Sequence, residues 1–363
     1  MVSMRQSVDL TGGERVRKLV ERAVGVPAAA VAAERRAGHA SVRVYWRARW
    51  EEAGPPRRSR SAVVMLLPPD APPDEIGKAG PTGAVPFVAV QTYLARIGVR
   101  VPGIIGWSQE EGFAVLEDLG DDMMVTRLAG GEPRDPLYLA AIDQLARMRV
   151  RAEKAPDPGC VAFQRRYDRD LYRWELDHFL EWVLATWKNA GLSPTEREVV
   201  DRHFEHIARR LAAEPDGFTH RDYQSRNIMV LPGGEQAVID FQDALLGPRQ
   251  YDLVSLLRDS YVSLDHDFIR RMVGHYLTAT TALGGPELDK AEFRRVFDLL
   301  TVQRKLKDAG RFVYLDRVKG NPDFLGFVPV ALGYVREAFD RLPELAELQS
   351  VLSRHVPELA PDA

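Results

Sequence analysis

The residues best suited to chemistry lie in two short runs in the middle of the chain. The first reads HRDYQSRN over residues 220–227 and contains Asp222 and Asn227; the second reads IDFQD over residues 239–243 and contains Asp240. A carboxylate can orient a hydroxyl group and accept its proton, while an amide oxygen and a second carboxylate are hard ligands suited to Mg²⁺. This set predicts phosphoryl transfer, with Asp222 as the base and Asn227 and Asp240 as metal ligands.

The segment between the two runs predicts the geometry that such a site requires. Residues 228–231 and 237–239 are apolar, and they flank the turn sequence Pro-Gly-Gly at 232–234. Two apolar runs joined by a glycine-rich turn are typical of a β-hairpin, which would bring Asn227 and Asp240 side by side. We expect His220 to pack within this catalytic loop and Asp252 to support it from outside.

The two runs resemble the H-R-D-x-x-x-x-N and D-F-G motifs of kinases. Gln242 stands in place of the last glycine, as is common in the aminoglycoside phosphotransferase and choline kinase superfamily. Within it the chain resembles the cell-wall sugar kinases that act on the anomeric hydroxyl of N-acetylmuramate and N-acetylglucosamine. The resemblance spans about residues 35–320 and is carried by the runs 220–227, 239–248 and 251–259, with shorter matches at 40–47, 116–121, 167–169 and 303–307.

The resemblance implies a fold and a reaction. The expected fold is α+β and two-lobed like a protein kinase, with an antiparallel sheet in a small N-lobe (residues 1–118) and a mostly helical C-lobe (residues 119–363). The expected reaction is Mg²⁺-dependent transfer of the γ-phosphoryl group of ATP or GTP to the anomeric hydroxyl of an N-acetylated amino sugar, giving a sugar 1-phosphate for peptidoglycan recycling. The expected partners are therefore a small sugar and a nucleotide.

Length and composition limit the other function classes. A chain of 363 residues with 45% hydrophobic content is long enough for two lobes with sizeable cores. The net charge of −3 gives no electrostatic reason to expect nucleic-acid binding, and the single Cys160 rules out an internal disulfide framework. The sequence shows neither a signal peptide nor a run of about 18 apolar residues, so we expect a cytoplasmic protein without a membrane span.

Apolar periodicity predicts the elements of the N-lobe. A helix is expected around residues 16–24, a second helix begins at Pro86, and strands are expected at 42–49, 62–67 and 112–117. The proline- and glycine-rich stretch 68–86 is predicted to be a loop, and the basic run 57–60 a solvated one.

The predicted N-lobe lacks both members of the Lys–Glu pair that steadies the nucleotide phosphates in kinases. Strand 62–67 has no lysine, and Gln91 takes the place of the helix glutamate. We therefore expect Arg43 or Arg47 to contact the phosphates. Further predicted nucleotide contacts are Ser41, in a loop over the phosphates at 38–41, and the backbone of the inter-lobe hinge at Glu117 and Leu119.

The acceptor site is expected in the C-lobe. Residues 164–190 predict a long helix whose aromatic residues pack mainly in the core; alternatively, one or two of them form a wall against a sugar ring while Glu175 accepts hydrogen bonds from its hydroxyls. Arg226 and Asp243 are further candidates for substrate contact. Arg304 shares a helix face with Lys307 and Arg311, which is either a solvated basic stripe or a surface that pairs with an anionic acceptor.

Three rival functions remain open at this level. A kinase for aminoglycosides or another cationic molecule would favour several carboxylates in the acceptor cleft, and the basic segment 303–311 disfavours it. A non-catalytic, pseudokinase-like nucleotide-binding protein is compatible with the missing lysine. A protein kinase is disfavoured because only about seven residues separate Phe241 from Arg249, too few for an activation segment. The exact sugar, the choice between ATP and GTP, and the oligomeric state do not follow from the sequence.

Overall fold

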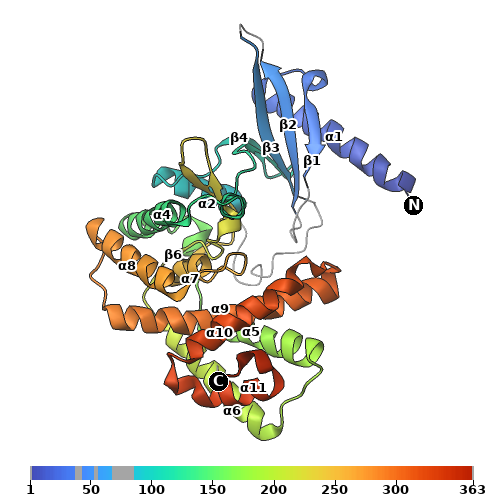
Figure 1. Ribbon diagram of the computed structural model, residues 1–363. Coiled ribbons are helices and arrows are strands. Elements are labelled where there is room, and N and C mark those ends of the chain that lie inside the picture. The colour runs from blue at the N-terminus through green and yellow to red at the C-terminus, as the bar shows by residue number, and fades with distance from the viewer. Residues whose placement is uncertain (1, 37–42, 53–55, 68–85, 362–363) are drawn as a thin grey trace.

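The N-lobe is built on an antiparallel sheet. The computed structural model describes residues 2–36, 43–52, 56–67 and 86–361. Five strands pair antiparallel in the order β1-β2-β3-β5-β4 (Figure 1). The elements of the N-lobe are α1 (Val2–Val24), η1 (Ala28–Ala30), β1 (Ala32–Arg35), β2 (Val44–Glu52), β3 (Arg58–Leu66), α2 (Pro86–Arg96), β4 (Ile104–Ser108) and β5 (Phe113–Glu117).

Each face of this sheet packs against a different helix. Side chains alternate between the two faces of a strand, so neighbouring residues join different cores. On one side Val64 and Val115 pack with Val20 of α1, and on the other Met65 packs in the large core that includes Phe87 of α2. The helix predicted around residues 16–24 and the helix start at Pro86 are confirmed.

The C-lobe is mostly helical, with two small sheets at the site. Strands β6 and β9 pair antiparallel, and β7 and β8 form the predicted hairpin. The strands of the C-lobe are β6 (Asp216–Thr219), β7 (Ile228–Val230), β8 (Gln236–Val238) and β9 (Leu245–Pro248). Its helices are α3 (Met124–Ala129), α4 (Arg134–Lys154), α5 (Arg169–His178), α6 (Pro194–Ala212), α7 (Tyr251–Leu257), α8 (His266–Ala282), α9 (Lys290–Lys319), α10 (Val328–Phe339) and α11 (Ala346–His355). Single turns of helix are η3 (Val161–Phe163), η5 (Ser225–Asn227), η6 (Pro322–Phe327), η7 (Pro343–Leu345) and η8 (Pro357–Leu359), and η4 (Phe179–Trp187) is a π-helix.

The long helix α9 crosses the C-lobe and packs against α5, η4 and α10 (Figure 1). Gly310 lets it approach the point where α5 passes into η4, because a Cβ atom there would lie 2.8 Å from the His178 carbonyl oxygen. π-Helical turns are uncommon and often occur near functional sites. Here the turn lies directly after the helix that carries Glu175.

Two sequence predictions need correction, and one pair of strands was not predicted. The helix expected over 164–190 begins only at Arg169, since the Asp168 carboxylate caps it by accepting from the Leu171 amide, and it ends as a π-helix. The β6–β9 pair was missed because its strands have only four residues each. The predicted loop at 57–60 largely belongs to β3, although Arg58 and Arg60 are exposed. The predicted loops at 38–41 and 68–86 lie almost entirely outside the described residues.

The two-lobed α+β fold is confirmed. The boundary between residues 118 and 119 stays a proposal, consistent with β5 ending at Glu117 and α3 beginning at Met124. None of the helices in the described part of the chain has the length and apolar content that a bilayer span requires.

Gly310→Ala should destabilise the protein by about 1–3 kcal/mol, because the added methyl group has to displace the backbone of residues 178–179. Gly274→Ala is the matched control, since no atom lies within 4 Å of a Cβ at that position in α8, and it should leave stability unchanged or raise it by about 0.5–1 kcal/mol. Thermal unfolding of both variants checks this. An equal midpoint for Gly310→Ala and wild type would contradict the close approach.

Candidate active site

The catalytic loop leaves β6 in an unusual backbone conformation. Arg221, directly before Asp222, has φ = 79°, in the left-handed region that non-glycine residues rarely adopt. Asp252, at the start of α7, accepts hydrogen bonds from the amides of His220 (2.7 Å) and Arg221 (2.9 Å). Arg304 of α9 donates to the Arg221 carbonyl oxygen at 2.8 Å. Asp252 therefore supports the loop, as expected.

His220 connects the loop to the strand end that carries Asp240. Burial lowers the pKa of His220, so its ring is neutral at physiological pH. The Asp222 amide donates to Nδ1 at 3.2 Å, which makes Nε2 the protonated nitrogen, and Nε2 lies 3.0 Å from the Ile239 carbonyl oxygen. His220 thus packs within the loop as expected and ties Asp222 to the neighbour of Asp240.

A buried ion pair lies beneath the loop. The Arg221 guanidinium donates to Glu175 at 2.9 Å and to the Tyr167 hydroxyl at 2.8 Å, and Gln303 donates to the other Glu175 oxygen at 2.8 Å. Burial alone would raise the pKa of Glu175, but the charges of Lys307 and Arg221 outweigh it and lower the pKa. Glu175 is fully buried, with both oxygens engaged, so the prediction that it accepts from sugar hydroxyls is corrected: it holds Arg221.

Asp222 keeps 33% of its side chain exposed and pairs with Arg304 at 3.1 Å. Partial burial raises the pKa of Asp222, but the charges of Arg304, Lys307 and Arg221 more than compensate and lower it. The carboxylate is therefore ionised at neutral pH and available to accept a hydrogen bond from a substrate hydroxyl. Arg304 is only 2% exposed, which corrects the solvated-stripe alternative, and its guanidinium pairs with Asp222 where the other alternative places an anionic acceptor.

Asn227 and Asp240 are brought together by the hairpin. The Ile239 amide donates to the Asn227 carbonyl oxygen at 3.0 Å. The Asn227 side-chain amide donates to the Asp222 carbonyl oxygen at 2.9 Å, which leaves its Oδ1 atom for another partner. Asp240 has φ = 63° and accepts from Gln242 at 2.9 Å. One amide oxygen and one carboxylate fit Mg²⁺, which takes few protein ligands and shares substrate phosphates.

The two arginines predicted to contact the phosphates, Arg43 and Arg47, have different surroundings. Arg47 is buried, with its guanidinium 2.8 Å from Asp118, and it also pairs with Asp121 and donates to the Gly120 carbonyl oxygen. Arg47 therefore fixes the hinge to β2, which corrects its assignment to the phosphates. Arg43 hydrogen-bonds to Tyr45, and the charges of Asp240 and Asp243 both act on the Tyr45 hydroxyl, so the start of β2 lies near these two carboxylates.

The hinge itself is well supported. The Glu117 carboxylate accepts from Arg100 (2.8 Å) and from the Gly103 amide (3.0 Å), and hydrogen bonding from Arg100 lowers its pKa. Leu119 packs against Met229 and Leu231 of the hairpin. Ser41 lies outside the described residues. Gln91, which replaces the kinase glutamate, is buried and donates to the Pro102 carbonyl oxygen at 3.0 Å.

The two remaining acceptor candidates, Arg226 and Asp243, neighbour Asn227 and Asp240 in the chain. The Arg226 guanidinium lies over the Tyr261 ring, 3.6 Å from its centroid, with Phe327 at 5.5 Å. Asp243 lies 3.3 Å from the Gln242 side-chain amide. Among the aromatic residues of α5 and η4, Tyr172 and Phe179 are core as expected, whereas Trp174 is 40% exposed.

Sequence reasoning missed several residues that hold the loop. Asp259 accepts from the backbone amide of Ser225 at 2.9 Å and from its hydroxyl, and the Tyr251 hydroxyl accepts from Arg304 at 2.8 Å. Asp259 follows the end of α7 by two residues, so its closeness in the sequence to Asp252 is the signal that could have indicated a second support.

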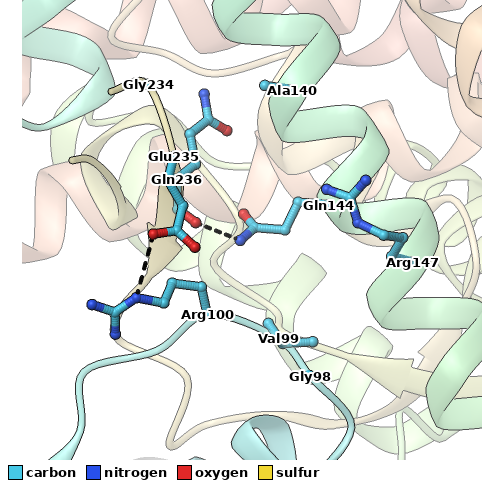
Figure 2. A pocket seen from close by; sticks show the side chains of 9 residues that line it. All are labelled: Gly98, Val99, Arg100, Ala140, Gln144, Arg147, Gly234, Glu235 and Gln236. Carbon is cyan, nitrogen blue, oxygen red and sulfur yellow. Dashed lines mark hydrogen bonds and ion pairs between the residues drawn. The ribbon is translucent and has the colours of Figure 1, made fainter. Parts of the chain in front are cut away.

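A surface pocket of about 250 Å³ lies between residues 98–100, α4 and the hairpin turn (Figure 2). Gln144 in its wall donates to the Gln236 carbonyl oxygen at 2.8 Å and accepts from the hydroxyl of Tyr223, the residue after the base, at 3.0 Å. Arg100, also in the wall, is the partner of Glu117. Residues of the pocket wall thus contact Glu117 and Tyr223, but Asp222, Asn227 and Asp240 do not line the pocket.

Sequence comparison identifies relatives over most of the chain. Residues 32–293 match the model of a phosphotransferase enzyme family. N-acetylmuramate/N-acetylglucosamine kinases are 34% identical in Neisseria meningitidis (87% of this chain, 88% of the relative) and 33% identical in Pseudomonas putida (90% and 89%). A third, from Pseudomonas aeruginosa, is 35% identical, covering 86% of each chain. The family resemblance seen in the motifs is confirmed.

Structural comparison gives the same fold. A choline kinase from Streptococcus pneumoniae superposes with a TM-score of 0.57 at 12% identity, covering 89% of this chain and 99% of the other. An ADP-bound aminoglycoside phosphotransferase gives 0.56 at 12% identity, covering 90% and 98%. At such identities the likeness concerns the fold alone.

Asp222→Asn should reduce kcat by about 10²–10⁴-fold, the effect typical of a lost general base, and leave nucleotide affinity nearly unchanged. Steady-state kinetics and calorimetry with Mg·ATP measure the two quantities. Asp267→Asn, at an exposed position on α8, is the matched control and should behave as wild type. Turnover of Asp222→Asn within a few-fold of wild type would contradict the assignment.

Proposed function

The chain belongs to the phosphotransferase enzyme family, and we propose that it transfers the γ-phosphoryl group of a nucleotide, with Mg²⁺, to the anomeric hydroxyl of an N-acetylated amino sugar. An enzyme of this family phosphorylates an alcohol group. The sugar assignment rests on three relatives of 33–35% identity that are named N-acetylmuramate/N-acetylglucosamine kinase. The product would be a sugar 1-phosphate for use in peptidoglycan recycling.

The pairing of Asp222 with Arg304 supports an acidic hydroxyl as the acceptor. Arg304 fixes one carboxylate oxygen, and the lowered pKa makes Asp222 a weak base. Proton transfer is most efficient when the pKa values of base and acid are not far apart. An anomeric hydroxyl is more acidic than an ordinary alcohol, so a weak base is sufficient for it. Asp222 would orient this hydroxyl and accept its proton as the bond to phosphorus forms.

Asn227 and Asp240 would hold Mg²⁺, which neutralises charge on the nucleotide phosphates when bound. Arg43, which hydrogen-bonds to Tyr45 near Asp240, is the cation we assign to the phosphates in place of the missing lysine. The hinge backbone at Glu117 and Leu119 would bind the base of ATP or GTP. Asp243 would contact the acceptor or support the metal ligands.

A cationic acceptor such as an aminoglycoside is the main alternative. The base is surrounded by the positive charges of Arg304, Lys307 and Arg221, which would repel such a molecule. A non-catalytic role is disfavoured because Asp222, Asn227 and Asp240 lie together, supported by Asp252, Asp259 and Arg304.

The product distinguishes these functions. Purified protein with Mg·ATP should release one ADP for each N-acetylglucosamine or N-acetylmuramate consumed, and ³¹P NMR should show a phosphate coupled to the anomeric proton. Phosphate on another hydroxyl would contradict the anomeric assignment, and turnover of aminoglycosides but not of either sugar would contradict the acceptor class.

Asp240→Ala should abolish the Mg²⁺-dependent part of nucleotide binding, because octahedral Mg²⁺ tolerates little change in ligand geometry. Calorimetry with ATP in the presence and absence of Mg²⁺ checks this. Asp323→Ala, at an exposed position in η6, serves as the control. If Asp240→Ala bound Mg·ATP as tightly as wild type, the metal assignment would fail.

A further inference from the structure

Lys307 lies one helical turn beyond Arg304 on α9 and is more accessible than its basic neighbours. The side chains of Arg304 and Lys305 are 2% and 3% exposed, whereas that of Lys307 is 17% exposed. The charge of Lys307 lowers the pKa of both Asp222 and Glu175, so its ammonium group lies close to the catalytic loop. Lys307 therefore borders the space beside the base.

Among the cations paired around the base, Lys307 has the longest distance to its nearest carboxylate. Arg221 pairs with Glu175 at 2.9 Å, Arg304 with Asp222 at 3.1 Å and Lys305 with Asp308 at 2.8 Å. Lys307 shares Asp308 with Lys305, at the longer distance of 3.4 Å. Four cations thus face three carboxylates in this group. A ligand carboxylate beside Lys307 would balance the group.

The next carboxylate and the next cation do not change this balance. Asp259, which faces Lys305, uses its oxygens to accept from Ser225 and Tyr261. Arg226 adds a further positive charge, lying over the ring of Tyr261. With these two included, the group still carries one excess positive charge.

We propose that Lys307 binds a carboxylate carried by the acceptor and thereby selects N-acetylmuramate over the neutral N-acetylglucosamine. This inference rests on the proposed function. N-acetylmuramate carries its acid on a lactyl ether at C3, two ring carbons from the anomeric C1. Lys307 follows Arg304, the partner of Asp222, by three residues, so the two side chains lie on the same face of α9. With the anomeric hydroxyl at Asp222, the lactyl group would therefore reach Lys307.

The test compares kcat/KM for the two sugars in wild type, Lys307→Met and Lys319→Met. The last is the matched control, since Lys319 is exposed near the end of the same helix. Lys307→Met should lower kcat/KM for N-acetylmuramate about ten- to a hundredfold more than for N-acetylglucosamine, the effect of a lost charge-assisted contact. The ratio of the two values cancels any common effect on Asp222, and turnover of N-acetylglucosamine reports that the variant is folded.

The methyl ester of N-acetylmuramate gives a second measurement that needs no variant. It has nearly the size of the acid without its charge, so wild type should prefer the acid by a similar factor, and Lys307→Met should lose this preference. An unchanged ratio of the two kcat/KM values in Lys307→Met, or equal use of acid and ester by wild type, overturns the role of Lys307 and leaves the proposed function standing. Failure of wild type to phosphorylate either sugar overturns the proposed function and this inference together.

Discussion

The backbone of Arg221 is the constraint on which the site depends. A non-glycine residue in the left-handed region costs about 1–3 kcal/mol, and here it directly precedes Asp222. Hydrogen bonds to charged groups contribute about 1.5–3 kcal/mol each; the Arg221 amide donates one to the Asp252 carboxylate, and the Arg221 carbonyl oxygen accepts another from Arg304. Its side chain is held in addition by Glu175. The conformation persists because three separate helices hold it.

This arrangement joins the packing of the C-lobe to its chemistry. Helix α9 supplies Arg304 to the base and Gln303 to Glu175, so its position along α5 affects both ends of the buried ionic network. The close approach at Gly310 fixes that position. A buried ion pair seldom adds net stability, but removing one partner leaves an uncompensated charge. We therefore regard the network as a device that positions Asp222 and keeps it ionised.

The grouping of the candidate catalytic residues could be predicted from the sequence because they come from one continuous segment. Asp222, Asn227 and Asp240 lie within 19 residues, and a short hairpin is the local structure that brings the last two together. Asp252 could be expected as a support because it follows closely. Long elements with a regular apolar periodicity, such as the helix that ends at Val24, could be predicted equally well.

The roles of Arg47, Glu175 and Arg304 could not be derived in the same way. Each is a charged residue whose partner lies far away in the chain: 71 residues from Arg47 to Asp118, 46 from Glu175 to Arg221 and 82 from Arg304 to Asp222. Burying a charged side chain is unfavourable unless a partner compensates its charge. A single sequence does not show a partner that lies far along the chain, so it suggests that such residues face solvent or substrate. The π-helical end of α5 depends on packing against α9 and has no local signal.

The most direct test of this account is kcat of the Arg304→Met variant, with Arg317→Met on the exposed side of the same helix as the control. Methionine keeps the length of the side chain and removes the charge. The account predicts a loss of about 100-fold or more in kcat, with nucleotide affinity nearly unchanged, because Asp222 is no longer oriented while the metal ligands remain. Wild-type kcat in Arg304→Met would contradict the central role of α9 in positioning the base.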